Sequence, residues 1–168
     1  PHWRRLTTLT LVGTMNVTDA TLAQLGRCCP LLTSLAISDL RNVTGTFLMS
    51  LTQQCPLITR LYIQSFDMPS SSVLAIRGWP NLRTRGVMGW FKDDPGDTTT
   101  AILQHCRQLE RLYLASSRIN DSTVAAVAFN CPHLRHFMHD SCGVSGVTDA
   151  GICALARGCR GLATVELV

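Results

Sequence analysis

Two groups of residues in this sequence are of the types that bind metals or carry out nucleophilic and acid–base chemistry. Cys28 and Cys29 are adjacent, and the chain holds eight cysteines in all. A second group, from His133 to Asp140, contains three histidines. Thiolates and imidazoles ligate zinc, and histidine is a frequent general base. Whether either group acts in this way depends on the elements that hold it.

The histidine group falls on a predicted strand, and strand geometry separates its members. Successive side chains point to opposite faces of a strand, so His136 and Met138 share a face with Asp140. His139 points the other way, at a position that similar segments fill with leucine or isoleucine, which indicates an interior histidine held by a hydrogen bond. The chain also lacks a G-x-S-x-G turn, a phosphate-binding loop and paired carboxylates at fixed spacing. We therefore expect no catalytic residue, no bound metal and no cofactor.

The chain is built from repeats. The segments CPLLTSLAI (29–37) and CPLITRLYI (55–63) match at nearly every position. The apolar residue at the fourth position marks each copy: Leu6, Leu32, Ile58, Leu82, Leu109, Leu134 and Leu162. These anchors are 26, 26, 24, 27, 25 and 28 residues apart, so the chain consists of units of about 26 residues.

Each unit divides into a predicted strand and a predicted helix. The first half reads L-x-x-L-x-L, whose last positions alternate as in a strand with one buried face. In VTDATLAQLGRC (17–28), apolar residues recur near helical spacing. Thr18, Asn120 and Thr148 are expected to cap helices, with the following aspartate at the positive end of the helix dipole. One strand and one helix cannot bury both apolar faces alone, so we expect parallel stacking into a curved solenoid.

The sequence of these units is similar to a known repeat. The pattern C-P-x-L-x-x-L-x-L, followed by T-D, L-x-x-L and a closing cysteine, resembles the cysteine-containing leucine-rich repeat. Over essentially the whole chain it looks like the repeat region of F-box/leucine-rich-repeat proteins. The resemblance implies an α/β fold, a right-handed horseshoe-shaped solenoid of about six units, each with one short parallel strand and one helix. It also implies that the repeats hold a substrate while an F-box, outside this chain, docks on a Skp–cullin ubiquitin ligase.

The repeats fill residues 1–168, which we expect to form one leucine-rich-repeat domain. Trp3 already belongs to a unit, and Val168 falls within a predicted strand. Solenoids need polar caps on their end repeats, and no cap is visible at either end. We therefore expect a segment of a longer solenoid, or ends that other chains cover.

The repeat gives most of the cysteines a structural explanation. They share a slot three residues before the apolar anchor, and Trp3 and Trp79 fill this slot in other units. A slot that accepts cysteine or tryptophan is apolar, and free cysteine behaves as a small buried hydrophobe. Cys142 matches a second family position, where a thiol satisfies loop backbone groups; Cys153 is expected to pack on a helix face, and the exposure of Cys28 stays open. The expected structural cysteines are Cys29, Cys55, Cys106, Cys131, Cys142 and Cys159.

Composition and charge argue against several partners. The formal net charge of +4 is small and the arginines are scattered, so we expect neither nucleic acid nor membrane as a partner. No apolar stretch reaches the length of about 18 residues that a membrane span needs, and the opening PHWRR is not a signal peptide. Cysteines spread at one per unit favour reduced thiols and a cytoplasmic or nuclear location. Sequons at Asn16, Asn42 and Asn120 argue the other way, although all three coincide with predicted helix starts.

The usable surface of such a solenoid is its concave strand face. The middle units carry two Arg-x-Tyr pairs there, and arginine and tyrosine dominate the hot spots of protein interfaces. We predict a protein-binding surface formed by Arg60, Tyr62, Gln64, Arg111, Tyr113, His136, Met138 and Asp140. The alternative is that these side chains only solvate and brace the sheet.

The fourth unit offers a second candidate surface. The loop after its strand breaks the pattern, and its predicted rim residues are Phe91, Lys92 and Asp93. Loops on rigid scaffolds often carry function, but a harmless insertion explains the loop equally well. In the same unit Arg85 replaces an inward apolar residue, which predicts a local change of register.

Three functions remain open on the sequence alone. The first is a non-catalytic protein-recognition module, the substrate receptor of an F-box-type ubiquitin ligase. The second is a structural or scaffolding component of a large protein assembly. The third is a receptor for a small anion that uses Arg60 and Arg111, since arginine pairs well with carboxylate and phosphate.

Overall fold

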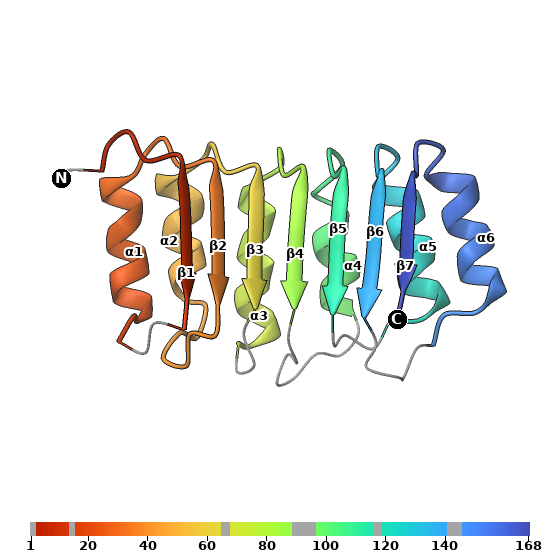
Figure 1. Cartoon of the computed structure of the whole chain (residues 1–168), viewed down its shortest axis with the longest axis horizontal. Helices are drawn as coiled ribbons and strands as arrows, with labels where there is room; N and C mark the ends of the chain where they lie inside the picture. Colours follow the sequence, from red (N-terminus) through yellow and green to blue (C-terminus); the bar gives the residue numbers. More distant parts are fainter. Residues whose placement is uncertain (1–2, 14–15, 65–67, 89–96, 116–118, 141–145) are drawn as a thin grey trace.

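The computed structural model describes residues 3–13, 16–64, 68–88, 97–115, 119–140 and 146–168. Within these residues seven parallel strands form one sheet in sequence order, so each strand lies beside the next (Figure 1). The strands are β1 (Thr8–Val12), β2 (Ser34–Ser38), β3 (Arg60–Gln64), β4 (Thr84–Met88), β5 (Arg111–Ala115), β6 (His136–Asp140) and β7 (Thr164–Leu167). The predicted α/β solenoid of strand–helix units is confirmed.

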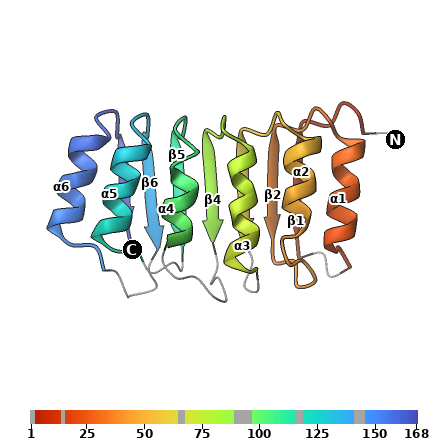
Figure 2. The same cartoon turned by 180° about the vertical axis from the view of Figure 1, so that it is seen from behind.

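Helices cover one face of this sheet, as the view from behind shows (Figure 2). They are α1 (Asp19–Cys28), α2 (Phe47–Gln54), α3 (Ser70–Val73), the 3-10 helix η1 (Leu74–Gly78), α4 (Asp97–Leu103), α5 (Asp121–Asn130) and α6 (Asp149–Gly158). The third unit departs from the one-helix pattern, because its short α3 continues directly as η1. Among the described residues no helix lies on the opposite face, which we call the open face.

The strands pair residue for residue, without an offset. Leu61 of β3 pairs with Arg85 of β4, and Arg85 pairs with Leu112 of β5. The predicted change of register at Arg85 is therefore wrong. The alternation of side chains continues unbroken through β4, so Arg85 points inward and is only 1% exposed.

A tight turn joins each helix to the following strand. The Cys29 N–H donates to the carbonyl O of Leu25 (2.9 Å) and ends α1, and the Leu32 N–H then donates to the carbonyl O of Cys29 (3.1 Å). The same four-residue turn recurs at the later cysteines and at Trp79. Pro30 suits its second position, because the fixed φ of proline matches that position of the common turns. The C-P-x-L motif is therefore the turn that aims the strand.

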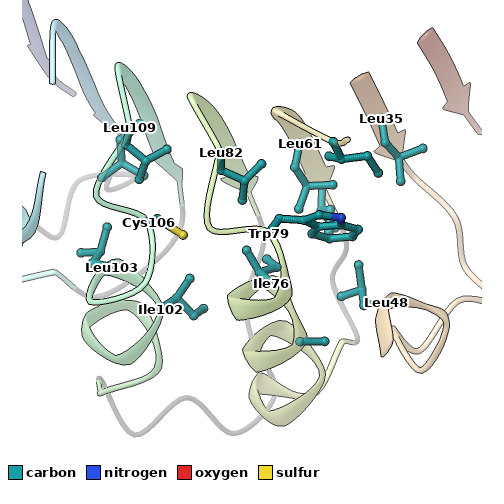
Figure 3. Packing of buried hydrophobic residues seen from close by; sticks show 14 of the residues in the cluster. Leu35, Leu48, Leu61, Ile76, Trp79, Leu82, Ile102, Leu103, Cys106 and Leu109 are labelled. Atoms are coloured by element: carbon teal, nitrogen blue, oxygen red, sulfur yellow. The ribbon is translucent and has the colours of Figure 1, made fainter. Parts of the chain in front are cut away.

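The core is the apolar layer between the sheet and the helices (Figure 3). Trp79 is fully buried near the middle of the solenoid, in one cluster with Leu48, Leu61 and Ile76. Trp3 fills the same slot of the first unit but is 55% exposed, because β1 is an edge strand and no described unit packs on its outer side. Since residues from neighbouring units share this layer, stacking is what buries it.

Two aspartates connect consecutive helices at their starts. Asp19 accepts hydrogen bonds from the N–H (2.7 Å) and hydroxyl (3.0 Å) of Thr44 and from the N–H of Phe47 (3.2 Å). Asp121 accepts them from the N–H (2.8 Å) and hydroxyl (2.6 Å) of Thr148. Each carboxylate therefore satisfies free N–H groups in the following unit, in the manner of a cap. The sequence pattern predicted only an interaction with the dipole of the helix that carries the aspartate.

The three predicted cap residues behave differently. The Asn120 Oδ1 accepts from the Thr123 N–H (3.1 Å), and the Thr148 hydroxyl accepts from the N–H two residues on (3.3 Å), so both caps are confirmed. Thr18 makes no cap hydrogen bond, and that prediction is wrong. Its hydroxyl instead lies 3.4 Å from the hydroxyl of Thr21.

Candidate functional site

The histidine group is divided between the interior and the surface. His139 is fully buried, and its Nδ1 lies 3.1 Å from the carbonyl O of Leu114. Burial lowers the pKa of His139 and favours the neutral ring. His136 is half-buried on the open face and His133 is exposed before β6. The predicted interior, hydrogen-bonded histidine is confirmed, and no set of metal-binding side chains comes together in the described ranges.

Buried cysteines connect several units to the unit before them. The Cys55 thiol donates to the carbonyl O of Cys29 (3.3 Å). The Cys159 thiol donates in the same way to Cys131 (3.3 Å). Trp79 occupies this slot in its unit and donates its indole N–H to the carbonyl O of Cys55 (2.8 Å). The predicted burial is confirmed, and in these units the residue in the slot also donates a hydrogen bond, which cysteine and tryptophan can both do.

Burial makes these thiols poor nucleophiles. It raises the pKa of Cys55 and Cys159 to about 11 and that of Cys131 to about 12. Because the thiolate is the reactive form of cysteine, these three side chains are chemically inert at neutral pH. Their role is structural.

The two cysteines outside the repeat slot are more accessible. Cys28 is partly exposed at the end of α1 and packs against the edge of the core. Cys153 is exposed, and its predicted packing on a helix face is wrong. The buried side of α6 carries Gly151 and Leu155, and the helical period turns Cys153 away from it.

The eight predicted binding residues share the open face of β3, β5 and β6. Because the strands pair in register, equivalent positions form rows across the sheet. The first row is Arg60, Thr84, Arg111 and His136; the second is Tyr62, Gly86, Tyr113 and Met138; the third is Gln64, Met88, Ala115 and Asp140. We call these rows on β3–β6 the central groove.

Gly86 separates the two tyrosines of the central groove. Tyr62 leans over it, because a Cβ atom built on Gly86 would lie 2.5 Å from Cδ2 of Tyr62. A hollow of about 220 Å³ is lined by Tyr62, Tyr113, Leu114, Ala115, Met138 and Asp140. Pockets for drug-sized molecules occupy about 300–1,000 Å³, so this hollow suits one large apolar side chain better than a free small molecule.

Hydrogen bonds fix one wall of the hollow before anything binds. The Tyr62 hydroxyl donates to Oε1 of Gln64 (3.5 Å), and the Ser38 hydroxyl donates to the same oxygen (2.9 Å). Burial, and then the nearby Asp39 carboxylate, raise the pKa of Tyr62, so its hydroxyl stays protonated as a donor. A wall that is ordered in advance loses less entropy on binding.

A second hollow lies at the edge where the strands begin, and the sequence patterns did not predict it. Its volume is about 400 Å³, and it is lined by Arg83, Gln108, Glu110, Pro132, His133, Arg135 and Gly161. The Arg83 guanidinium donates to Glu110 Oε1 (2.6 Å). A usable signal was present, since Arg83, Glu110 and Arg135 each follow the apolar anchor and stand next to one another in register.

Comparison with known proteins bears on the fold. No protein-family model matches the chain. A solved internalin (inlF) from Listeria monocytogenes has a TM-score of 0.65 at 15% identity, over 96% of this chain and 40% of that chain. An internalin C2 (inlC2) from the same organism has a TM-score of 0.57 at 14% identity, over 96% of this chain and 80% of that one. Internalins are leucine-rich-repeat proteins.

This chain has a leucine-rich-repeat fold. At such identities the likeness shows the architecture alone, and the chain spans less than half the length of the first internalin. The central groove belongs to the open face of the leucine-rich-repeat strands, and the helices lie on the other side of the sheet (Figure 1). The F-box relationship is not confirmed by these comparisons.

The predicted rim of the leucine-rich-repeat domain is not placed. Phe91, Lys92 and Asp93 lie outside the described residues, as does Cys142. In the described ranges, no helix combines the length and apolar character needed to cross a bilayer.

Proposed function

We propose that this chain is a non-catalytic protein-recognition module that binds its partner in the central groove. The observation that carries the proposal is the hollow between Tyr62 and Tyr113, flanked by Arg60 and Arg111. Aromatic and arginine side chains around a pocket that accepts an apolar anchor are the usual composition of interface hot spots. The inert buried thiols and the interior His139 support the absence of catalysis, because the residues best suited to chemistry serve the fold.

We further propose that the chain is the substrate-recognition part of an F-box-type ubiquitin ligase receptor in the cytoplasm or nucleus. The support is the cysteine-containing repeat itself. Cys55 and Cys159, at the cysteine position of that repeat, donate thiol hydrogen bonds to the preceding unit, which gives the recurring cysteine a structural role. Buried free thiols fit a reducing compartment. On this proposal residues 1–168 form one continuous recognition domain.

The first experiment tests the groove. Arg60, Tyr62, Arg111 and Tyr113 are replaced together by alanine, and photo-crosslinking from position Thr84 identifies bound protein. We expect specific crosslinks that the fourfold variant abolishes. The matched control replaces Met49 and Phe129, which are 60% and 83% exposed on the helices, by alanine. Crosslinking that survives in a correctly folded fourfold variant contradicts the groove as the binding surface.

The second experiment tests the ligase assignment. The full-length protein containing this chain is affinity-purified, and Skp and cullin subunits are quantified by mass spectrometry. We expect both in stoichiometric amounts, and their recovery is expected to be unaffected by the fourfold groove variant. Absence of Skp and cullin, with partner crosslinking intact, favours instead a scaffolding role in a different assembly.

A further inference from the structure

The charges around the central groove are sorted along the strand direction. Four arginines lie at or just before the first residues of β3–β6: Arg60, Arg83, Arg111 and Arg135. Glu110 is the acidic residue among the described positions at this edge, and it is already paired with Arg83 at 2.6 Å. The edge where the strands begin is therefore strongly basic.

The opposite end of the same strands has a different character. The described residues of the last row include Gln64, Ala115 and Asp140, and none of these is a cation. Four residues of strand separate the two rows, a distance of about 13 Å. This distance exceeds the screening length of about 8 Å at physiological ionic strength, so charges on a partner interact with the two ends of the groove independently.

The two free guanidiniums are spaced for an extended peptide. Arg60 and Arg111 lie on β3 and β5, and two steps between parallel strands are about 10 Å. Three residues of an extended chain cover about the same distance. Both arginines are exposed, and in the described part of the chain neither makes an ion pair. The pair can therefore bind two carboxylates without first breaking an internal salt bridge.

We propose, resting on the proposed function, that the partner is an acidic peptide segment with a large apolar side chain. Its carboxylates pair with Arg60 and Arg111 at the basic edge. Its apolar side chain enters the hollow between Tyr62 and Tyr113, about two residues further along the strands. Arginine suits this role because its planar guanidinium binds carboxylates with two parallel hydrogen bonds.

The test uses three fluorescein-labelled peptides and fluorescence anisotropy. They have the cores Glu-Glu-Phe-Glu-Glu, Lys-Lys-Phe-Lys-Lys and Glu-Glu-Ala-Glu-Glu. We expect the acidic phenylalanine peptide to bind best and to weaken as salt is added. The double charge reversal Arg60→Glu/Arg111→Glu is expected to weaken its binding about tenfold or more and to favour the lysine peptide.

The matched control is Arg27→Glu/Arg157→Glu. It changes the net charge equally, but at exposed positions on α1 and α6, behind the sheet. If this control weakens binding as much as the groove reversal, or if the acidic peptide binds no better than the lysine peptide, the inference is wrong. If the lysine peptide binds and Tyr62→Ala/Tyr113→Ala abolishes that binding, the acidic partner is wrong but the groove remains the binding surface. If the tyrosine substitutions leave peptide binding unchanged, the proposed function is wrong as well.

Discussion

The Asp121 carboxylate binds both the backbone N–H (2.8 Å) and the hydroxyl (2.6 Å) of Thr148, although the two residues belong to different units. These hydrogen bonds hold the pKa of Asp121 below its usual value. Thr148 in turn accepts from the Ala150 N–H. One threonine therefore receives the aspartate of the preceding unit and caps its own helix.

The substitution Thr148→Ala removes the two hydroxyl contacts, to Asp121 and from the Ala150 N–H, and leaves the backbone N–H of residue 148 bonded to Asp121. We expect it to lower the free energy of unfolding by about 0.5–2 kcal/mol, the usual cost of losing a cap. Urea denaturation monitored by circular dichroism measures the change. Thr18→Ala is the matched control, because Thr18 holds the same place in the repeat without a cap hydrogen bond. Equal losses in both variants would show that the two contacts of the Thr148 hydroxyl contribute nothing.

The substitution Arg85→Leu is expected to stabilise the protein. Burial lowers the pKa of Arg85, and its Nε and Nη1 atoms have no hydrogen-bond partner among the described residues. Replacing even a paired buried charge and its partner by apolar residues is often neutral or gains about 1–4 kcal/mol, and Leu61 and Leu112 fill this position on the neighbouring strands. Thermal and urea denaturation measure the gain.

Arg85→Ala is the control for this prediction. It removes the charge but leaves a cavity, so its gain should be smaller than that of Arg85→Leu. A leucine variant that is less stable than the parent protein would contradict the prediction, because it would show that the Arg85 side chain stabilises the fold.

We expect the protein to lose stability on mild acidification, because of His139. Burial lowers its pKa below the ordinary value of 6.5. Below pH 6.5 the His139 side chain is protonated in the unfolded chain but stays neutral in the folded chain. The free energy of unfolding therefore falls as the pH falls through 6.5 towards the pKa of His139 in the folded state. Between pH 6.5 and 5 the loss is at most about 2 kcal/mol. Urea titrations at pH 7.5, 6 and 5 measure it.

The variant His139→Leu isolates this effect. Leucine lies beside this position in β5 as Leu114 and in β7 as Leu167, so the substitution fits the strand pattern. We expect the slope of stability between pH 6.5 and 5 to flatten. A slope that is unchanged in the leucine variant would assign the acid sensitivity to other groups.

We expect the cysteines of the native protein to differ in their rates of alkylation. Iodoacetamide at pH 8 should modify Cys153 first and Cys28 more slowly. Cys55, Cys131 and Cys159 should stay unmodified until the protein unfolds, because burial hides them and raises their pKa. Peptide mass spectrometry reads the order, and early labelling of Cys131 would contradict the core packing described above.

Much of this architecture follows from the sequence, because the spacing of the repeats determines which residues of neighbouring strands pair. The spacing of anchors such as Leu32 and Ile58 predicts in-register strands, and the observed pairing of Leu35 with Leu61 agrees. It also predicts which side chains share the open face. The reason is physical: alternation and stacking depend only on backbone periodicity.

Contacts between units were harder to predict. The reach of Asp19 to Thr44, and of the Cys55 thiol to Cys29, depends on how one unit sits against the next, which a single unit's pattern does not contain. The same applies to Arg85. An arginine at this inward position suggested a change of strand register, yet its long side chain fits beneath β4 and the register is undisturbed.

The aspartate contacts have a mechanical consequence. In the described residues they clamp α1 to α2 and α5 to α6, while the middle of the solenoid relies on the four-residue α3 and the 3-10 turn η1. The aspartate contacts therefore tie the helices together at the two ends of the solenoid, and the groove on β3–β6 lies between these two pairs of helices. On the proposed function, a polypeptide bound in the groove contacts strands from four consecutive units, so its binding free energy also stabilises the stacking of those units.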